Sequence, residues 1–179
     1  MKKIKLKIAN WLLKKQLKSL KREKTVSNFH TAKTVGVIFS VEQVQSYPKI
    51  KEFLDFLAEK NLQTFILAYC PFKEIPDTFI GHPRINIFTS RDLNWFFIPK
   101  VPMVSKFMAK DFDLLFDLTF SEDFPVKYVN NLSKAKFKIG SVSKNGKEHD
   151  MIIRIDEDQS LPYFIDQVKY YISQINKEE

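Results

Sequence analysis

The run Thr34-Val-Gly-Val-Ile-Phe-Ser40 decides the fold class of this chain. It is short, continuously apolar at its centre and rich in β-branched residues, which is typical of a strand buried on both faces of a parallel sheet. The segment 47–60 follows it, and its apolar side chains between Ile50 and Leu57 recur at helical spacing. A buried strand followed by an amphipathic helix predicts the first half of a βαβ unit.

The same alternation continues to the C-terminus. Further strands are expected at 62–69, 84–89, 112–119, 135–140 and 151–156. Further helices are expected at 101–110, 125–133 and 161–175. Strands separated by helices predict an α/β fold, a Rossmann-like three-layer sandwich with a mostly parallel sheet and helices on both faces. We expect residues 33–179 to form this single domain.

Composition narrows the class of protein. A length of 179 residues suits one domain, and 44% hydrophobic residues with 17 Phe exclude a disordered body. The one cysteine, Cys70, excludes an internal disulfide. No apolar run reaches the roughly 20 residues that span a bilayer, and the stretch 8–13 is too short for a signal-peptide core. We therefore expect a cytoplasmic protein.

The net charge of +8 is concentrated at one end of the chain. Residues 1–24 hold nine Lys, Arg22 and a single acid, Glu23, which gives this segment +9 and leaves −1 for the rest. The segment has no Pro or Gly and is rich in Lys and Leu, so it is predicted to be a basic helical arm. Residues 25–32 are predicted to link it to the domain. Such asymmetry indicates an anchor to nucleic acid or to an anionic membrane.

The arm has separate apolar and basic stripes at 100° per residue. The apolar stripe consists of Leu6, Ala9, Leu13, Leu17 and Leu20. Packing on the body explains this stripe, but it does not explain ten bases against one acid. Because charges at that density repel one another, we expect a polyanion as the counter-charge, and a structured RNA fits better than duplex DNA, since no recognition-helix or dimer pattern is present.

The predicted RNA contacts fall into two groups. Lysines of the arm should bind phosphates, and Trp11 should stack on a base or pack on a protein neighbour. A second basic patch comes from Lys136 and Lys138, which alternation places on one side of a strand, with Lys144 and Lys147 in the next loop. Lysines that protect an edge strand explain this patch equally well. The predicted RNA-binding residues are Lys2, Lys3, Lys5, Lys7, Trp11, Lys14, Lys15, Lys18, Lys21, Arg22, Lys136 and Lys138.

Signatures of cofactor chemistry are missing from the sequence. The turn after the first strand reads Ser40-Val-Glu-Gln-Val-Gln, where a dinucleotide-binding protein has G-x-G-x-x-G. The three histidines, His30, His82 and His149, have no metal-ligand spacing to one another or to Cys70. We therefore expect no cofactor, no metal, no small-molecule ligand and no catalytic residues.

One group of carboxylates offers an alternative. Asp117 ends a predicted buried strand, where open α/β sheets place their ligand crevices, and the neighbouring acids are Asp111, Asp113, Glu122 and Asp123. Paired carboxylates there could bind a cation or act as acid and base in a small enzyme. The favoured interpretation is structural: Asp111 and Asp113 open the strand, and Asp117 caps the turn that follows it.

Several segments carry a resemblance to known proteins. They are Trp11–Lys15, Ser90–Phe96, Phe112–Thr119, Asn131–Gly140 and Tyr163–Val168. Across nearly its whole length the chain resembles a lineage-restricted bacterial family of uncharacterised proteins, and it looks like a large-subunit ribosomal protein confined to that lineage. The resemblance implies ribosomal RNA and neighbouring ribosomal proteins as partners, and no catalysis.

A second resemblance concerns Phe112–Thr119 and the later Ser-Lys-Ala-Lys-Phe-Lys-Ile-Gly, which look like one half of a heptosyltransferase-type glycosyltransferase. The chain is too short for the two domains of such an enzyme, so this resemblance implies the fold and argues against the activity. The sequence thus predicts a structural, ribosomal or ribosome-associated RNA-binding protein that is not an enzyme. The alternatives are peripheral membrane attachment through the basic amphipathic helix and a small enzyme that uses Asp117.

Overall fold

The centre of the protein is a six-stranded sheet in the order β3-β2-β1-β4-β5-β6, and each of its five neighbouring strand pairs is parallel. The computed structural model describes residues 1–179 apart from 42–44, 46, 121–122, 142–147, 156–159 and 176–179. The chain builds one half of the sheet outward from β1 and then returns to build the other half from β4, which is the Rossmann strand order. The strands are β1 (Thr34–Ser40), β2 (Gln63–Cys70), β3 (Ile85–Thr89), β4 (Leu114–Asp117), β5 (Phe137–Ser141) and β6 (Met151–Ile153).

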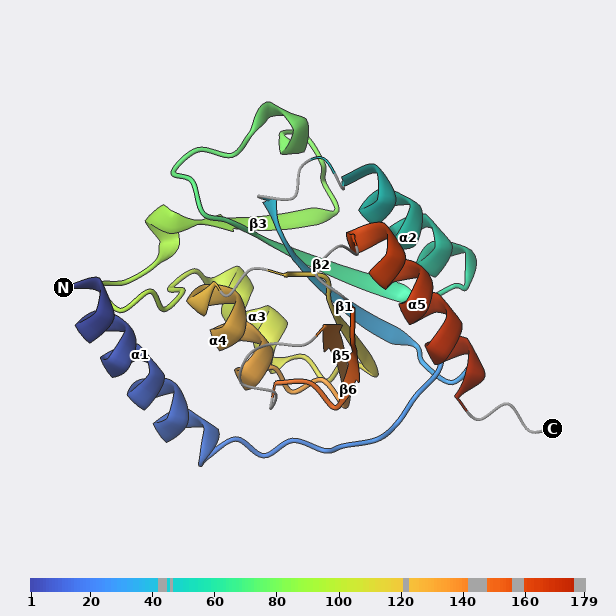
Figure 1. Ribbon diagram of the computed structural model, residues 1–179, viewed down its shortest axis with the longest axis horizontal. Helices are drawn as coiled ribbons and strands as arrows, with labels where there is room; N and C mark the ends of the chain where they lie inside the picture. Colours follow the sequence, from blue (N-terminus) through green and yellow to red (C-terminus); the bar gives the residue numbers. More distant parts are fainter. Residues whose placement is uncertain (42–44, 46, 121–122, 142–147, 156–159, 176–179) are drawn as a thin grey trace.

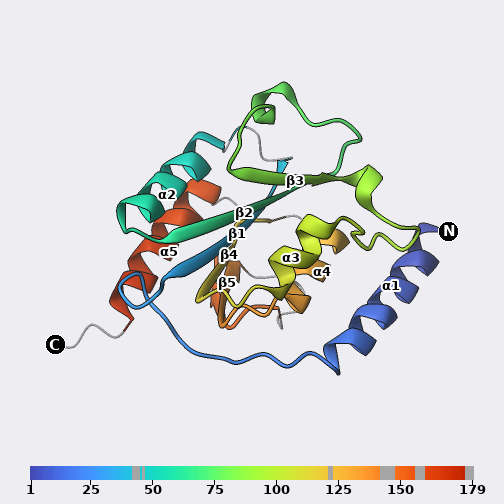
Figure 2. The same ribbon diagram turned by 180° about the vertical axis from the view of Figure 1, so that it is seen from behind.

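Helices cover both faces of this sheet (Figures 1 and 2). On one face α2 and α5 lie side by side, and on the other face lie α3 and α4. The three-layer arrangement predicted from the sequence is therefore confirmed. The helices are α1 (Lys2–Leu17), α2 (Tyr47–Glu59), α3 (Pro102–Ala109), α4 (Phe124–Leu132) and α5 (Leu161–Gln174).

Two apolar cores fill the spaces between the layers, because side chains along each strand alternate between the faces. From β1, Val37 and Phe39 join the core under α2 and α5, and Ile38 joins the core under α3 and α4. All three side chains are fully buried. This double burial explains why the strand has the unbroken apolar sequence from which the fold was predicted.

Helix α1 lies outside the three layers and packs against α4 (Figure 1). It ends at Leu17, so the helical part of the arm is shorter than the predicted 1–24. The chain then continues without helix or strand to β1, and part of this segment is core rather than linker. Phe29 is buried with its ring centroid 5.2 Å from that of Phe56, and Asn28 donates a hydrogen bond to the Ile175 carbonyl at 2.7 Å.

The predicted strands and helices of residues 33–179 are all present, with ends shifted by a few residues. One interpretation of the second basic patch is wrong: β5 lies between β4 and β6, so Lys138 within it and Lys136 just before it do not protect a sheet edge. Strand β6 ends at Ile153, and the predicted end at Asp156 lies outside the described residues.

Candidate nucleic-acid interface

The inner face of α1 is apolar and holds the helix on the body. Ala9 and Leu13 are buried and pack with Phe124 and Tyr128 of α4. The Tyr128 hydroxyl donates a hydrogen bond to the Gln16 side-chain oxygen at 2.7 Å. Since these contacts use one face of the helix, the opposite face of α1 is turned toward solvent.

The outer side of α1 and the turn after it carry a dense positive charge. Residues 1–21 contain eight lysines and no acid. Seven of them are exposed, and none of the eight forms an ion pair with a residue that the structure describes. Lys5 is half-buried, and its ammonium lies 3.3 Å from the centroid of the Trp95 ring, a cation–π contact. The seven exposed lysines are Lys2, Lys3, Lys7, Lys14, Lys15, Lys18 and Lys21.

An exposed indole lies among these lysines. Trp11 is 60% exposed, and the Lys15 ammonium lies 5.8 Å from its ring centroid. Trp11 lines a shallow groove of about 530 Å³ along α1, whose other lining residues are Lys3, Leu6, Lys7, Asn10 and Lys14. The groove therefore combines a flat aromatic surface with three cations.

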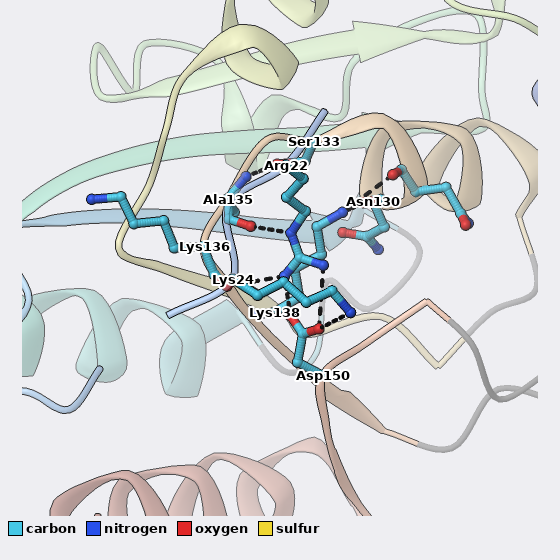
Figure 3. A network of polar contacts seen from close by, with 9 residues as sticks. Arg22, Lys24, Asn130, Ser133, Ala135, Lys136, Lys138 and Asp150 are labelled. Atoms are coloured by element: carbon cyan, nitrogen blue, oxygen red, sulfur yellow. Dashed lines mark hydrogen bonds and ion pairs between the residues drawn. The ribbon is translucent and has the colours of Figure 1, made fainter. Parts of the chain in front are cut away.

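Arg22 differs from the lysines before it, because the body binds it. Its guanidinium forms a bidentate ion pair with the Asp150 carboxylate and donates hydrogen bonds to the carbonyls of Ala135 and Lys136, as Figure 3 shows. Lys24 pairs with the same carboxylate at 3.0 Å. We call Arg22, Lys24 and Asp150 the Arg22 clamp. Burial alone would raise the pKa of Asp150, but hydrogen bonds from Arg22, the Lys138 N–H and Lys24 lower it. Arg22, predicted to bind RNA, is already paired within the protein.

Lys138, the second residue of the predicted basic patch, is not on the surface. It is only 2% exposed, and its ammonium donates hydrogen bonds to the carbonyls of Asn130 and Asn131 at the end of α4 (Figure 3). Burial, with a smaller contribution from the positive charge of Arg22, lowers the pKa of Lys138 from 10.5 to about 7. The prediction that Lys138 binds RNA is therefore corrected: alternation gave its side of the strand, but α4 covers that side.

Lys136 is partly exposed and pairs with Asp113 at 3.0 Å. Burial alone would raise the pKa of Asp113, but hydrogen bonds from the N–H groups of Lys33 and Thr34 and from Lys136 lower it to about 2. Asp113 thus fastens the start of β4 to the start of β1 and to Lys136, in agreement with the predicted strand-opening role. Lys144 and Lys147 of the predicted patch lie outside the described residues.

The candidate carboxylates do not gather into one site. Asp113 lies before β4 and Asp117 ends it, so they are at opposite ends of the strand; Asp111 is exposed, and Glu122 lies outside the described residues. Among the described residues, no group of three or more His, Cys, Asp or Glu side chains could hold a metal ion.

Asp117 is nevertheless the centre of a buried polar cluster. One of its oxygens accepts a hydrogen bond from the Thr119 N–H at 3.0 Å, which closes the turn that the sequence predicted. The other accepts from the Asn130 amide and lies 3.0 Å from Nε2 of His149. Both oxygens are thus occupied by the protein itself.

The contact between His149 and Asp117 was not predicted from the sequence. Only the strand order could have indicated it, because in a parallel sheet the loop after β5 starts beside the end of β4. Gly140 makes this approach possible: a Cβ at position 140 would lie 2.4 Å from Nε2 of His149. The spacing of the two residues along the sequence does not indicate such a contact.

None of the described helices is long and apolar enough to cross a membrane. Comparison with curated proteins gives no match. The model of one protein family, described as a family of unknown function (DUF6913), matches residues 5–175. Since this match covers nearly the whole chain, the protein belongs to the DUF6913 family of unknown function.

Proposed function

We propose that this protein binds a structured RNA through the exposed lysines of α1 and the turn after it, as a structural component without catalysis. Ribosomal RNA of the large subunit is the partner we favour, with neighbouring ribosomal proteins around the body, because the chain resembles a large-subunit ribosomal protein. The choice of ribosomal RNA as the partner rests on this resemblance, whereas binding to RNA in general rests on the exposed lysines.

One observation carries the proposal: the eight lysines of residues 1–21 have no acid among them and no ion-pair partner in the described part of the protein. Elsewhere in the protein several cations do have an acidic partner, as Arg22 has Asp150, Lys136 has Asp113 and Lys127 has Glu148. Like charges on neighbouring helical turns repel, so this arrangement is unfavourable without an external anion. A nucleic-acid backbone supplies one negative charge per phosphate over a long surface.

The packing of α1 also favours binding. A disordered basic tail pays an entropic cost when it becomes ordered on RNA. Here Ala9 and Leu13 hold the helix on α4, and the Arg22 clamp holds the chain after it. The backbone that carries the lysines is therefore already ordered before binding, and preorganisation of this kind increases affinity. Lysines lack the bidentate geometry of arginine, so we expect them to position a backbone rather than to read a sequence.

The test compares two variants of equal charge by fluorescence anisotropy with a labelled structured RNA. One variant replaces Lys7, Lys14 and Lys18 with Gln, and the control replaces three exposed lysines of the body, Lys51, Lys60 and Lys73, with Gln. We expect the arm variant to lose affinity and to reduce the slope of log K against log salt by roughly two to three, since each phosphate contact contributes about 0.7–0.9. Equal effects of both variants, or no RNA binding at 50 mM salt, would contradict the proposal.

A second candidate function rests on exposed apolar side chains of α1. Ile4, Ile8 and Trp11 are exposed near the lysines, and a basic amphipathic helix with such residues can lie in an anionic membrane surface. We rank this candidate lower because the main apolar residues of α1, Ala9 and Leu13, are buried against α4. Binding to acidic liposomes in the absence of RNA, unaffected by ribonuclease, would favour the membrane.

A further inference from the structure

Trp11 is not explained by the packing of the protein. The contacts that hold α1 on the body come from Ala9 and Leu13, whereas the Trp11 indole is 60% exposed beside the groove of about 530 Å³. Exposure of a large aromatic ring to water is unfavourable. Tryptophan, whose indole has a polar N–H at one edge, is common at binding surfaces. A ligand of this surface would contact both this ring and the cations around it.

Three lysines line the same groove as Trp11. Lys3 and Lys7 are one helical turn apart, and Lys14 lies two turns beyond Lys7, so at 1.5 Å per residue the three span about 16 Å along α1. That length can follow several phosphates of a nucleic-acid strand. A flat ring within a row of cations is the combination with which proteins bind unpaired nucleotides, by stacking the base and neutralising the phosphates.

We propose that the groove on α1 binds an unpaired nucleotide of the RNA, with its base stacked on Trp11 and the flanking phosphates on Lys3, Lys7 and Lys14. This inference rests on the proposed function and makes it narrower. A base inside a continuous double helix is already stacked on both faces, so it has no face for Trp11. The preferred ligand is therefore RNA with a loop, a bulge or a single-stranded end.

The experiment makes Trp11 the only tryptophan of the full-length protein. The Trp95→Phe variant removes the other indole and keeps an aromatic ring beside Lys5. This protein is titrated with two RNAs of equal length, a hairpin with an unpaired loop and a blunt duplex, while Trp fluorescence and binding are recorded separately. The same titrations are repeated with Trp11→Leu, which removes stacking, and Trp11→Phe, which retains part of it.

We expect the hairpin to quench Trp11 and the duplex to leave its fluorescence nearly unchanged. Trp11→Leu should weaken hairpin binding about 5- to 150-fold, the range for the loss of one stacked base, with a smaller loss for Trp11→Phe. Duplex binding should be the same in all three proteins, because it depends on the lysines.

The remaining outcomes separate this inference from the proposed function. If both RNAs bind with strong salt dependence and equal affinity, with no quenching and no effect of Trp11→Leu, the base-stacking inference is wrong and the RNA-binding proposal stands. If neither RNA binds, both fail. A blue shift of Trp11 fluorescence with acidic liposomes but no response to RNA also overturns both and favours a membrane surface.

Discussion

The buried amine of Lys138 gives the protein a specific dependence of stability on pH. Its pKa is about 7 in the folded protein against 10.5 as the ordinary value, chiefly because burial disfavours the charged form. Below pH 7 the amine is charged in both the folded and the unfolded chain, so the full cost of burying the charge opposes folding. Between pH 7 and about 10.5 the folded protein has lost this proton and the unfolded chain keeps it, so stability rises with pH.

The size of this effect follows from the shift. Each pKa unit corresponds to about 1.4 kcal/mol, so a shift from 10.5 to about 7 makes the charged amine cost about 5 kcal/mol at acidic pH. Lys138→Met removes the titrating group and also the hydrogen bonds to the Asn130 and Asn131 carbonyls, which adds a loss that does not depend on pH. The free energy of unfolding of the variant, relative to that of the wild type, should therefore be highest at pH 6–7. As the pH rises toward 10, the wild type should gain on it by about 1.4 kcal/mol per pH unit.

Urea denaturation followed by far-ultraviolet circular dichroism at pH 6, 7, 8, 9 and 10 measures this difference. The difference between the two proteins is the informative quantity, because other groups titrate equally in both. Lys134→Met is the matched control, since Lys134 is exposed and only four residues away. A constant difference in the free energy of unfolding between wild type and Lys138→Met from pH 7 to 10 would refute the argument.

Three further substitutions, one of them with a matched control, test the packing of the arm and of the Asp117 cluster. Asp150→Asn leaves the two cations of the Arg22 clamp without their carboxylate and should lower the free energy of unfolding by about 2–4 kcal/mol, measured by urea denaturation. Leu13→Ala should cost about 2–4 kcal/mol and expose α1 to limited proteolysis, whereas Ile8→Ala, on the outer face, should change stability by less than about 0.5 kcal/mol. Gly140→Ala should displace the His149 ring, because the added methyl group would lie 2.4 Å from Nε2. The free energy of unfolding should fall by about 1–3 kcal/mol. An unchanged environment of the ring in the nuclear magnetic resonance spectrum would contradict this.

The sheet was predictable because each strand is buried by the same physical cause. Strand β1 begins at Thr34 and ends at Ser40, as its apolar run predicted, since helices cover both faces. The end of α1 was not predictable in this way. Lysine and leucine favour helix through residue 24, but Arg22 reaches the Ala135 and Lys136 carbonyls and Asp150 from a chain that has already left the helix. Tertiary contacts thus override local propensity.

The residues of the candidate interface could be predicted from the sequence, but their contacts with distant parts of the chain could not. Counting charges along the sequence identified the lysines of α1, because a cluster of bases without acids is a local property of the sequence. It did not distinguish Lys136, which is partly exposed, from Lys138, which α4 covers, because alternation gives the side of a strand and not what packs there. The contact of His149 with Asp117 joins residues 32 positions apart, and only the order of the strands brings them together.

Point substitutions test the arm better than its removal does. Deleting residues 1–24 would take Arg22 from Asp150 and uncover Phe124 and Tyr128, so a loss of binding could follow from damage to the body. Replacing Lys7, Lys14 and Lys18 with Gln changes only exposed side chains. This variant therefore separates the charge of the arm from its packing.

Sedimentation of cell lysate through a sucrose gradient, with and without ribonuclease, tests RNA binding by this protein most directly. The wild type should sediment with the large ribosomal subunit at low salt and move to the top of the gradient after ribonuclease treatment. The Lys7, Lys14 and Lys18 variant should remain near the top in both samples, and the Lys51, Lys60 and Lys73 control should follow the wild type. Wild-type protein that stays at the top without ribonuclease, or that sediments equally with and without it, would contradict the account.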